Sequence, residues 1–453
     1  MSKESSTTAT PAAAAAAIPE WVEHRMLSEA VSSLRRKLYQ KAKQEAKFRF
    51  YSLFGHVLRP DVLKAAWEQV RRNKGAPGVD GVTIDQIVNA EGGPERFVAE
   101  VGEALRTRSY KPSPVRRVYI PKPDGRERPL GIPTVRDRVV QTAVLLVLEP
   151  IFEADFRDCS YGFRPGRGAH QAIREIEGHL NGGLREVYDA DLKGYFDSIP
   201  HDKLHRALRM RLADRSVLKL INLWLQAPVV DERKGGPPQR NRTGTPQGGV
   251  ISPLLANVYL HWFDVFFHAP DGPAMWAKAK LVRYADDFVI LAHYQGQHLQ
   301  DWVRKTLEAR MGLEINQTKT RVVNLAQPRA SLDFLGFTFR YDRDLYQRER
   351  RYLNVSPSKK AQARARERVR SMTDSSQCFQ PIPELIGRVN RFTAGWASYF
   401  AALGYPRMAL RDLNRYVQLR MTRHLQRRSQ RPYRLPKGTT YYRHLANLGL
   451  VYQ

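Results

Sequence analysis

The chain has 453 residues, enough for two or three packed domains, and its 74 lysines and arginines against 45 acidic residues give a net charge of +29. That excess predicts a polyanionic partner, and aromatic residues at 10% of the chain favour nucleic acid over anionic lipid, because bases stack on aromatic rings. Only Cys159 and Cys378 are present, which excludes a disulfide framework and a four-cysteine zinc site, and no apolar run approaches the roughly 20 residues of a membrane span.

The N-terminal part divides into a tail and a basic helical region. Residues 1–20 are rich in serine, threonine and alanine and lack the order of a secretion signal, which predicts a disordered tail. From residue 21 to about 51 the pattern is helical and basic. Turn-forming residues at 74–81 interrupt it, and we assign 21–112 to an N-terminal extension and the start of the first lobe.

A basic β-hairpin is predicted next. Residues 115–120 read as a strand that leads through the turn residues 123–125 into 128–133. Apolar residues then recur at helical spacing, which predicts a buried helix behind the hairpin (Val139, Val140, Ala143, Val144, Val147, Leu148 and Ile151).

The middle of the chain alternates strands and helices. Residues 186–192 predict a short strand, and a helix begins near His201. Ser252 and Pro253 supply an N-cap and a first-turn proline for a further helix. Residues 281–285 and 288–292 are apolar runs joined by Asp286 and Asp287, which predicts a tight hairpin with carboxylates at its tip.

Beyond Arg340 the strands are expected to stop and helices to dominate residues 341–453. Between residues 408 and 428 one apolar stripe recurs at helical spacing (Leu410, Leu413, Val417, Met421 and Leu425). Residues 341–453 hold 23 lysines and arginines against 7 acidic residues, a net of +16 out of +29. We therefore expect this quarter of the chain to bind nucleic acid most tightly.

Asp191, Asp286 and Asp287 are the candidates for chemistry. Phosphoryl transfer from a nucleoside triphosphate uses two divalent cations that carboxylates from different strands hold together. Magnesium takes few protein carboxylates, so three acids suffice. An isolated Asp-Asp pair in a turn is more often structural, because aspartate favours turns for local hydrogen bonding.

The Asp286-Asp287 pair is not isolated, because it belongs to one of three motifs that follow one another along the chain. Residues 283–290 contain Tyr-Ala-Asp-Asp, residues 189–199 place an aspartate five positions before an aromatic residue, and residues 244–257 contain a Gln-Gly-Gly loop ahead of the predicted helix. Together they resemble the catalytic motifs of reverse transcriptases. The resemblance implies a right-hand polymerase of the α+β class, with fingers and a palm with an antiparallel sheet over 113–340 and an all-helical thumb and maturase region over 341–453.

The resemblance also implies roles for individual residues. It makes Asp191, Asp286 and Asp287 catalytic. The same three aspartates and Leu192 are the four implied ligands of two Mg²⁺ ions. Asp189 and Asp197 are expected to have structural or supporting roles beside them. For the incoming nucleotide it implies a set of five: Arg116, Lys122, Arg128, Phe196 and Gln247. Phe196 matches the aromatic that rejects a ribose 2′-hydroxyl, with a plain core phenylalanine as the alternative. Arg117 and Arg126 are taken as a solvated basic face.

Four further segments indicate the branch. Residues 74–81 and 161–167 are typical of the group II intron branch, residues 332–337 look like the motif that grips the primer end, and residues 385–400 resemble the maturase thumb. On this basis the chain is similar to group II intron-encoded reverse transcriptase/maturases. With about fifty residues after Phe400 and no Cys-containing endonuclease, the endonuclease-lacking branch is expected.

The function implied is RNA-templated extension of a DNA primer in a bacterial cytoplasm, with intron RNA bound to assist splicing and mobility. The expected partners are template and intron RNA, a DNA primer or target, and deoxynucleoside triphosphates, with no membrane. We expect Arg411, Arg415 and Arg423 to contact RNA, a solvated face being the alternative. Two rivals stay open: a non-catalytic splicing factor, and a related enzyme co-opted for phage defence or repair without its own intron.

Overall fold

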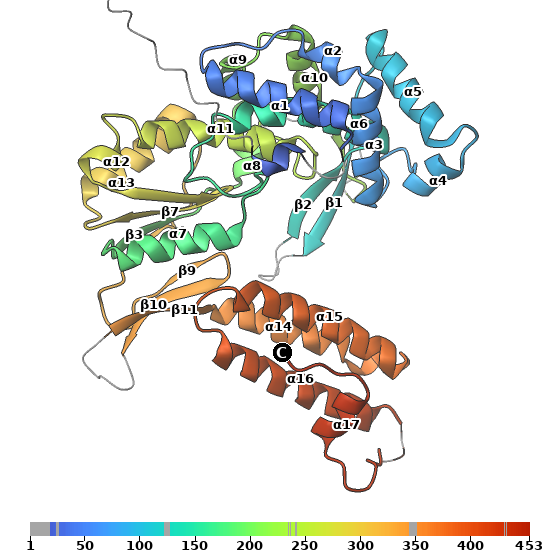
Figure 1. Ribbon diagram of the computed structural model, residues 1–453, viewed down its shortest axis with the longest axis vertical. Coiled ribbons are helices and arrows are strands. Elements are labelled where there is room, and N and C mark those ends of the chain that lie inside the picture. Colours follow the sequence, from blue (N-terminus) through green and yellow to red (C-terminus); the bar gives the residue numbers. More distant parts are fainter. Residues whose placement is uncertain are drawn as a thin grey trace, which may run out of the picture.

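The computed structural model describes residues 19–23, 27–121, 127–233, 235, 237–240, 242–343, 351–429, 431 and 433–453. A β-hairpin projects from the N-terminal helices, a helix-flanked sheet follows, and a helical bundle ends the chain (Figure 1). This confirms the α+β right-hand architecture. Apart from residues 19 and 20, the expected tail lies outside the described residues, so its disorder stays a prediction. Across the described ranges, no helix combines the length and apolarity that a membrane crossing requires.

The N-terminal helices pack around the predicted buried helix α6 (Val135–Glu153), whose residues Val139, Val144 and Leu148 are fully buried. The others in this region are η1 (Glu20–Glu23), α1 (Glu29–Gln44), α2 (Leu53–Val57), α3 (Pro60–Arg72), α4 (Ile84–Asn89) and α5 (Gly93–Arg106). One expectation is wrong in extent: the basic helix does not fill residues 21–51. It begins after Ser28, whose hydroxyl accepts a hydrogen bond from the Val31 amide, and ends at Gln44.

The fingers hairpin is confirmed. Strands β1 (Val115–Pro121) and β2 (Glu127–Ile132) pair antiparallel, with Arg116 opposite Ile132. Two short strands, β4 (Pro228–Val230) and β5 (Gln239–Arg240), extend the sheet in the order β2-β1-β4-β5. The hairpin lies between the N-terminal helices and the C-terminal bundle and points toward that bundle (Figure 1).

The palm is a four-stranded antiparallel sheet in the order β6-β7-β3-β8. Its strands are β3 (Glu186–Ala190), β6 (Lys280–Tyr284), β7 (Asp287–Ala292) and β8 (Arg321–Asn324). The helices around it are α7 (Ala169–Asn181), α8 (Tyr195–Ser198), α9 (His201–Arg209), α10 (Arg215–Leu225), α11 (Ser252–Phe267), α12 (Pro273–Trp276), α13 (Gln297–Arg304) and the π-helical η2 (Lys305–Met311). Ser252 is the first residue of α11 and not its cap, because its hydroxyl donates to the Pro246 carbonyl instead.

A third sheet corrects the expectation that strands stop at Arg340. Strands β9 (Leu332–Phe334), β10 (Phe337–Arg343) and β11 (Arg351–Pro357) form an antiparallel sheet in the order β11-β10-β9. Leu353 and Val355 of β11 are buried in the same apolar cluster as palm residues Val187 and Val289. This shared core ties β11 to the palm, although it follows residue 340.

The thumb is helical, as expected. It consists of α14 (Lys359–Met372), η3 (Ser375–Gln377), α15 (Ile382–Ala401), α16 (Arg407–Arg427) and α17 (Tyr441–Asn447). Most of the predicted stripe of α16 is confirmed in its core, where Leu413, Val417, Met421 and Leu425 are buried. Leu410, the first residue of that stripe, is only half-buried.

Candidate active site

Strand pairing brings the three predicted catalytic aspartates to one end of the palm sheet. Asp191 directly follows β3, Asp287 opens β7, and Asp286 lies in the turn between β6 and β7. In the β3–β7 register Ala190 stands opposite Phe288, so continuing that register by one residue places Asp191 opposite Asp287. The hairpin with carboxylates at its tip is therefore confirmed as a structural prediction.

Burial, and then repulsion between the carboxylates, raises the pKa of two of these aspartates. Asp287 lines a cleft on one side, and the protein buries its other sides. This burial, followed by repulsion from Asp286, Asp191 and Asp189, raises the pKa of Asp287 to about 7. Burial also raises the pKa of Asp286, against the attraction of the Arg128 guanidinium. Such a cluster of acids stabilises a bound cation, because a cation removes the repulsion between them.

A divalent cation fits this donor set. Carboxylate oxygens are the ligands that Mg²⁺ prefers. Leu192 has a buried apolar side chain, so only its backbone carbonyl could contribute. Asp191 is engaged, since its Oδ2 accepts hydrogen bonds from Asn316 Nδ2 and Lys319 Nζ, both at 2.9 Å. Among the described residues, no group of three acidic, histidine or cysteine side chains is close enough to hold a metal ion. A cation bound at Asp191 would have to displace the Lys319 ammonium.

Gln247 links two other predicted residues. Its side-chain amide donates to Asp197 Oδ2 at 2.8 Å and its carbonyl oxygen accepts from Arg128 Nε at 2.9 Å. Helix α8, which follows the first catalytic strand, and the fingers hairpin therefore meet at one glutamine. Lys122, Arg126 and the hairpin turn lie outside the described residues.

Phe196 is 7% exposed and belongs to the main apolar core. Its ring meets that of Phe163 edge to face at 6.2 Å, and Phe163 is 55% exposed. The backbone carbonyl of Phe196 accepts from the Thr245 amide at 2.6 Å, which joins it to the Gln247 loop. Phe196 is thus a core residue beside the site, compatible with either of its two predicted roles.

Arg116 is brought to a different place from Arg128. Its guanidinium pairs with Glu232 at 3.1 Å and donates to the Pro77 carbonyl at 3.4 Å. The partner acid comes from the segment after β4, the strand that pairs with β1. No contact joins Arg116 to the three aspartates among the described residues.

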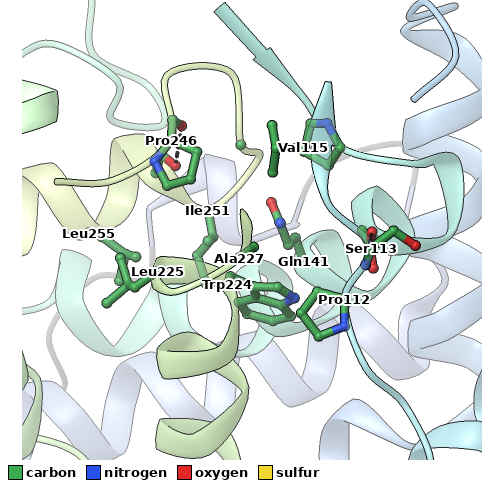
Figure 2. A pocket seen from close by; sticks show the side chains of 14 residues that line it. Pro112, Ser113, Val115, Gln141, Trp224, Leu225, Ala227, Pro246, Ile251 and Leu255 are labelled. Atoms are coloured by element: carbon green, nitrogen blue, oxygen red, sulfur yellow. Dashed lines mark hydrogen bonds between the residues drawn. The ribbon is translucent and has the colours of Figure 1, made fainter. Parts of the chain in front are cut away.

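The loop that carries Gln247 rests on the fingers and on α6. The Gly131 amide of β2 donates to the Gln247 carbonyl, and Gly248, at φ +108°, lies so close to the Gly131 carbonyl that a Cβ there would collide with it. Beneath the loop is a cavity of about 10 Å³, room for one water molecule. Figure 2 shows Gln141 and Trp224 around this cavity and Pro246 above it. Gln141 accepts from the Val250 amide at 2.8 Å, a support that no local signal in the sequence indicated.

A cleft of about 1310 Å³ joins the aspartates to the thumb. On the palm side Asp191, Asp287 and Lys319 line it. On the thumb side it is lined by a basic stripe of α14 and by aromatic residues of α15 (Lys360, Arg364, Arg368, Phe392, Trp396, Tyr399 and Phe400). The three cations of the basic stripe recur every four residues, so they share one face of the helix. This spacing is visible in the sequence, but it does not reveal which surface that face is turned toward.

The three arginines predicted to bind RNA lie elsewhere. Arg411, Arg415 and Arg423 are exposed on α16, and none lines the cleft. In Figure 1, α16 lies on the side of the bundle away from the palm. The thumb therefore presents two basic faces, one toward the aspartates and one outward.

Comparison with known proteins defines the class of this site. Residues 120–339 match the family "Reverse transcriptase (RNA-dependent DNA polymerase)" and residues 362–442 match "Group II intron, maturase-specific domain". The chain is an RNA-directed DNA polymerase, a class that works with divalent metal ions and RNA templates.

Similarity to individual proteins narrows the family to which the chain belongs. Protein YkfC of Escherichia coli (strain K12) is 34% identical over 371 residues, 73% of this chain and 93% of that protein. Group II intron-encoded protein LtrA of Lactococcus lactis subsp. cremoris is 31% identical over 355 residues, 65% of this chain and 57% of LtrA. The structure of a telomerase from Candida albicans is 14% identical and covers 73% of this chain and 62% of the telomerase chain, with a TM-score of 0.40. This similarity is too remote to assign any residue. The chain belongs to the group II intron reverse transcriptase/maturase family.

Proposed function

We propose that this chain extends a DNA primer on an RNA template at Asp191, Asp286 and Asp287, and that it binds intron RNA to assist splicing and mobility. The observation that carries the polymerase proposal is the register of β3 and β7, which sets Asp191 opposite Asp287 at the wall of a cleft of about 1310 Å³. The raised pKa of Asp287 supports a cation site there, because burial and neighbouring carboxylates disfavour its charge until a cation binds.

The chain's own residues then have distinct tasks. Two Mg²⁺ ions held by the aspartates, with the Leu192 carbonyl as a further ligand, would supply the Lewis-acid stabilisation that phosphoryl transfer requires. Arg128 and Gln247, joined at 2.9 Å, orient the incoming deoxynucleotide, with Lys122 as a further contact to its phosphates. Phe196 limits space beside the sugar. Arg116, paired with Glu232, stabilises the hairpin and remains a candidate contact to the nucleotide.

The cleft is the path of the template–primer duplex. Lys360, Arg364 and Arg368 face it with three cations at helical spacing, which suits a phosphate backbone. Aromatic residues from α15 lie in the same wall and suit contacts with sugars and bases.

The outward face of α16, with Arg411, Arg415 and Arg423, is the proposed site for intron RNA. The match of residues 362–442 to the maturase-specific domain supports it. That match disfavours an enzyme co-opted away from introns. The proposal sets the reaction in the bacterial cytoplasm, where RNA and deoxynucleotides are both present.

The test is extension of a 5′-labelled DNA primer on an RNA template with deoxynucleotides and Mg²⁺. Wild type should extend, whereas Asp286→Ala and Asp191→Ala should each fall below about one hundredth of that rate, because the carboxylates stabilise charge that develops during chemistry. Asp202→Ala, which removes an exposed carboxylate paired with Arg206 on α9, is the matched control and should retain activity. Extension by either active-site variant at the control's rate would contradict the assignment.

A further inference from the structure

Beneath the catalytic turn lies an ion pair that the mechanism above does not use. Arg283 and Asp264 are both 0% exposed, and they pair twice, Nε to Oδ1 at 2.9 Å and Nη2 to Oδ2 at 2.5 Å. Desolvation makes such a pair costly, and replacement by packed apolar residues is often neutral or stabilising. The pair therefore calls for an explanation other than stability.

The third nitrogen of the Arg283 guanidinium, Nη1, which does not bind Asp264, provides such an explanation. It donates to the backbone carbonyl of Ala285 at 2.9 Å and to Asn257 Oδ1 at 3.1 Å. Ala285 has φ of +57°, a left-handed conformation that disfavours any residue with a Cβ. It immediately precedes Asp286. Arg283 thus contacts the peptide unit that joins Ala285 to Asp286, and rotation of this unit would redirect the catalytic turn.

Close packing against Gly162 restricts the preceding peptide, which joins Tyr284 to Ala285. Asn257 donates to the Gly162 carbonyl at 2.8 Å, and a Cβ on Gly162 would collide with the Ala285 amide nitrogen. The Arg283 backbone is also held, since its amide donates to the Cys159 carbonyl and its carbonyl accepts from the Tyr161 amide, both at 2.8 Å. The turn is clamped between residues 159–162 and the guanidinium.

We propose that Arg283, oriented by Asp264 and Asn257, is a positioning residue that holds Ala285 left-handed and so aims Asp286 and Asp287 at the reaction. This inference rests on the proposed function of those aspartates. Asp264 orients the guanidinium with its two oxygens, and the third nitrogen holds the turn. A bidentate acid fixes the plane of an arginine as a lone carbonyl cannot.

The test separates positioning from stability. The double variant Arg283→Met/Asp264→Leu removes both charges together and should stay folded by thermal melting, while kcat for primer extension falls by about 100-fold with KM for deoxynucleotide nearly unchanged, because a 1 Å misplacement of a catalytic group has an effect of that order. Arg35→Met/Glu149→Leu is the matched control. Arg35 also pairs with a carboxylate, at 2.6 Å, and donates to a backbone carbonyl, but far from the turn, so kcat should be retained.

A second variant covers the case in which the double variant fails to fold. Arg283→Lys keeps a charge beside Asp264 but cannot reach Ala285 and Asn257 at once, and it should lose kcat; adding Ala285→Gly should recover part of it, since glycine adopts the left-handed conformation freely. Full kcat in the folded double variant, or in Arg283→Lys, would overturn the inference. If wild type itself does not extend a primer, the proposed function fails instead, so the two failures are distinguishable.

Discussion

The Nζ atom of Lys319 lies 2.9 Å from Oδ2 of Asp191, so a lysine from the segment before β8 neutralises one of the three aspartates proposed to bind metal. Lys319→Gln should therefore strengthen divalent binding by about two- to fivefold, the range expected for a partly exposed pair. Mn²⁺ binding measured by electron paramagnetic resonance gives this without reference to activity. Lys193→Gln is the control, because Lys193 pairs with Glu314 at 2.8 Å nearby. Equal affinity in both variants would mean that Lys319 does not compete with the cation.

Phe196→Ala should admit ribonucleotides by removing bulk beside the sugar. The deletion of so buried an aromatic ring also costs about 3–5 kcal/mol of stability, so the measurement is the ratio of kcat/KM for deoxynucleotides and ribonucleotides at a temperature where the variant is folded. Phe267→Ala, which removes another buried ring of the same core in α11, should lose stability without changing that ratio. An unchanged ratio in Phe196→Ala would assign this ring to the core alone.

The two basic faces of the thumb should separate two binding activities. Replacing Lys360, Arg364 and Arg368 with glutamine should weaken binding of a short primer–template and lower the slope of log affinity against log salt by up to about 3, one for each phosphate that a side chain no longer neutralises. Replacing Arg411, Arg415 and Arg423 should instead weaken binding of structured intron RNA and leave short primer–template extension intact. Fluorescence anisotropy across a salt series measures both. Weaker binding of the same RNA by both triple variants would indicate one continuous surface.

His261 should make stability depend on acidity. Burial lowers its pKa to about 4, with Arg283, Arg157 and Arg164 acting in the same direction and Asp264 opposing them. The unfolded chain binds a proton near pH 6.5 and the folded chain only near 4, so stability falls as pH drops through this window, by up to about 1.4 kcal/mol per unit. His261→Gln should flatten the dependence on pH of the free energy of unfolding between 6.5 and 4. Parallel curves for wild type and variant would show that this imidazole does not titrate as expected.

The local parts of the site were predictable from the sequence. Asp286 and Asp287 between two apolar runs specify a hairpin tip through the length of these runs and turn chemistry alone. Lys319 was missed because a lone lysine in a turn has no local signal, and it meets Asp191 only after β3 and β8 pair. Arg283 precedes the turn in the sequence, but its importance depends on Asp264 and Asn257, which come from a helix earlier in the chain.

The strand after Arg340 did have a signal. Leu353 and Val355 alternate with less buried residues over β11, a period of two that the abundance of helical patterns obscured. The direction of the α14 cations could not be predicted, because it is set by how the bundle packs against the palm. No segment taken alone contains that information.

The third sheet also limits how this enzyme can be recombined with its relatives. Phe400 and Leu403, from the end of α15 and the turn after it, share an apolar core with β9–β11 and with the palm, and the Tyr405 amide donates to the Val355 carbonyl at 2.8 Å. A chimera joined at residue 341 would cut β10 within its length and take the end of this strand, together with all of β11, from the other parent. A junction before Leu332 moves the sheet and the thumb together, so the contacts with α7 and the palm strands are among those to be matched between donors.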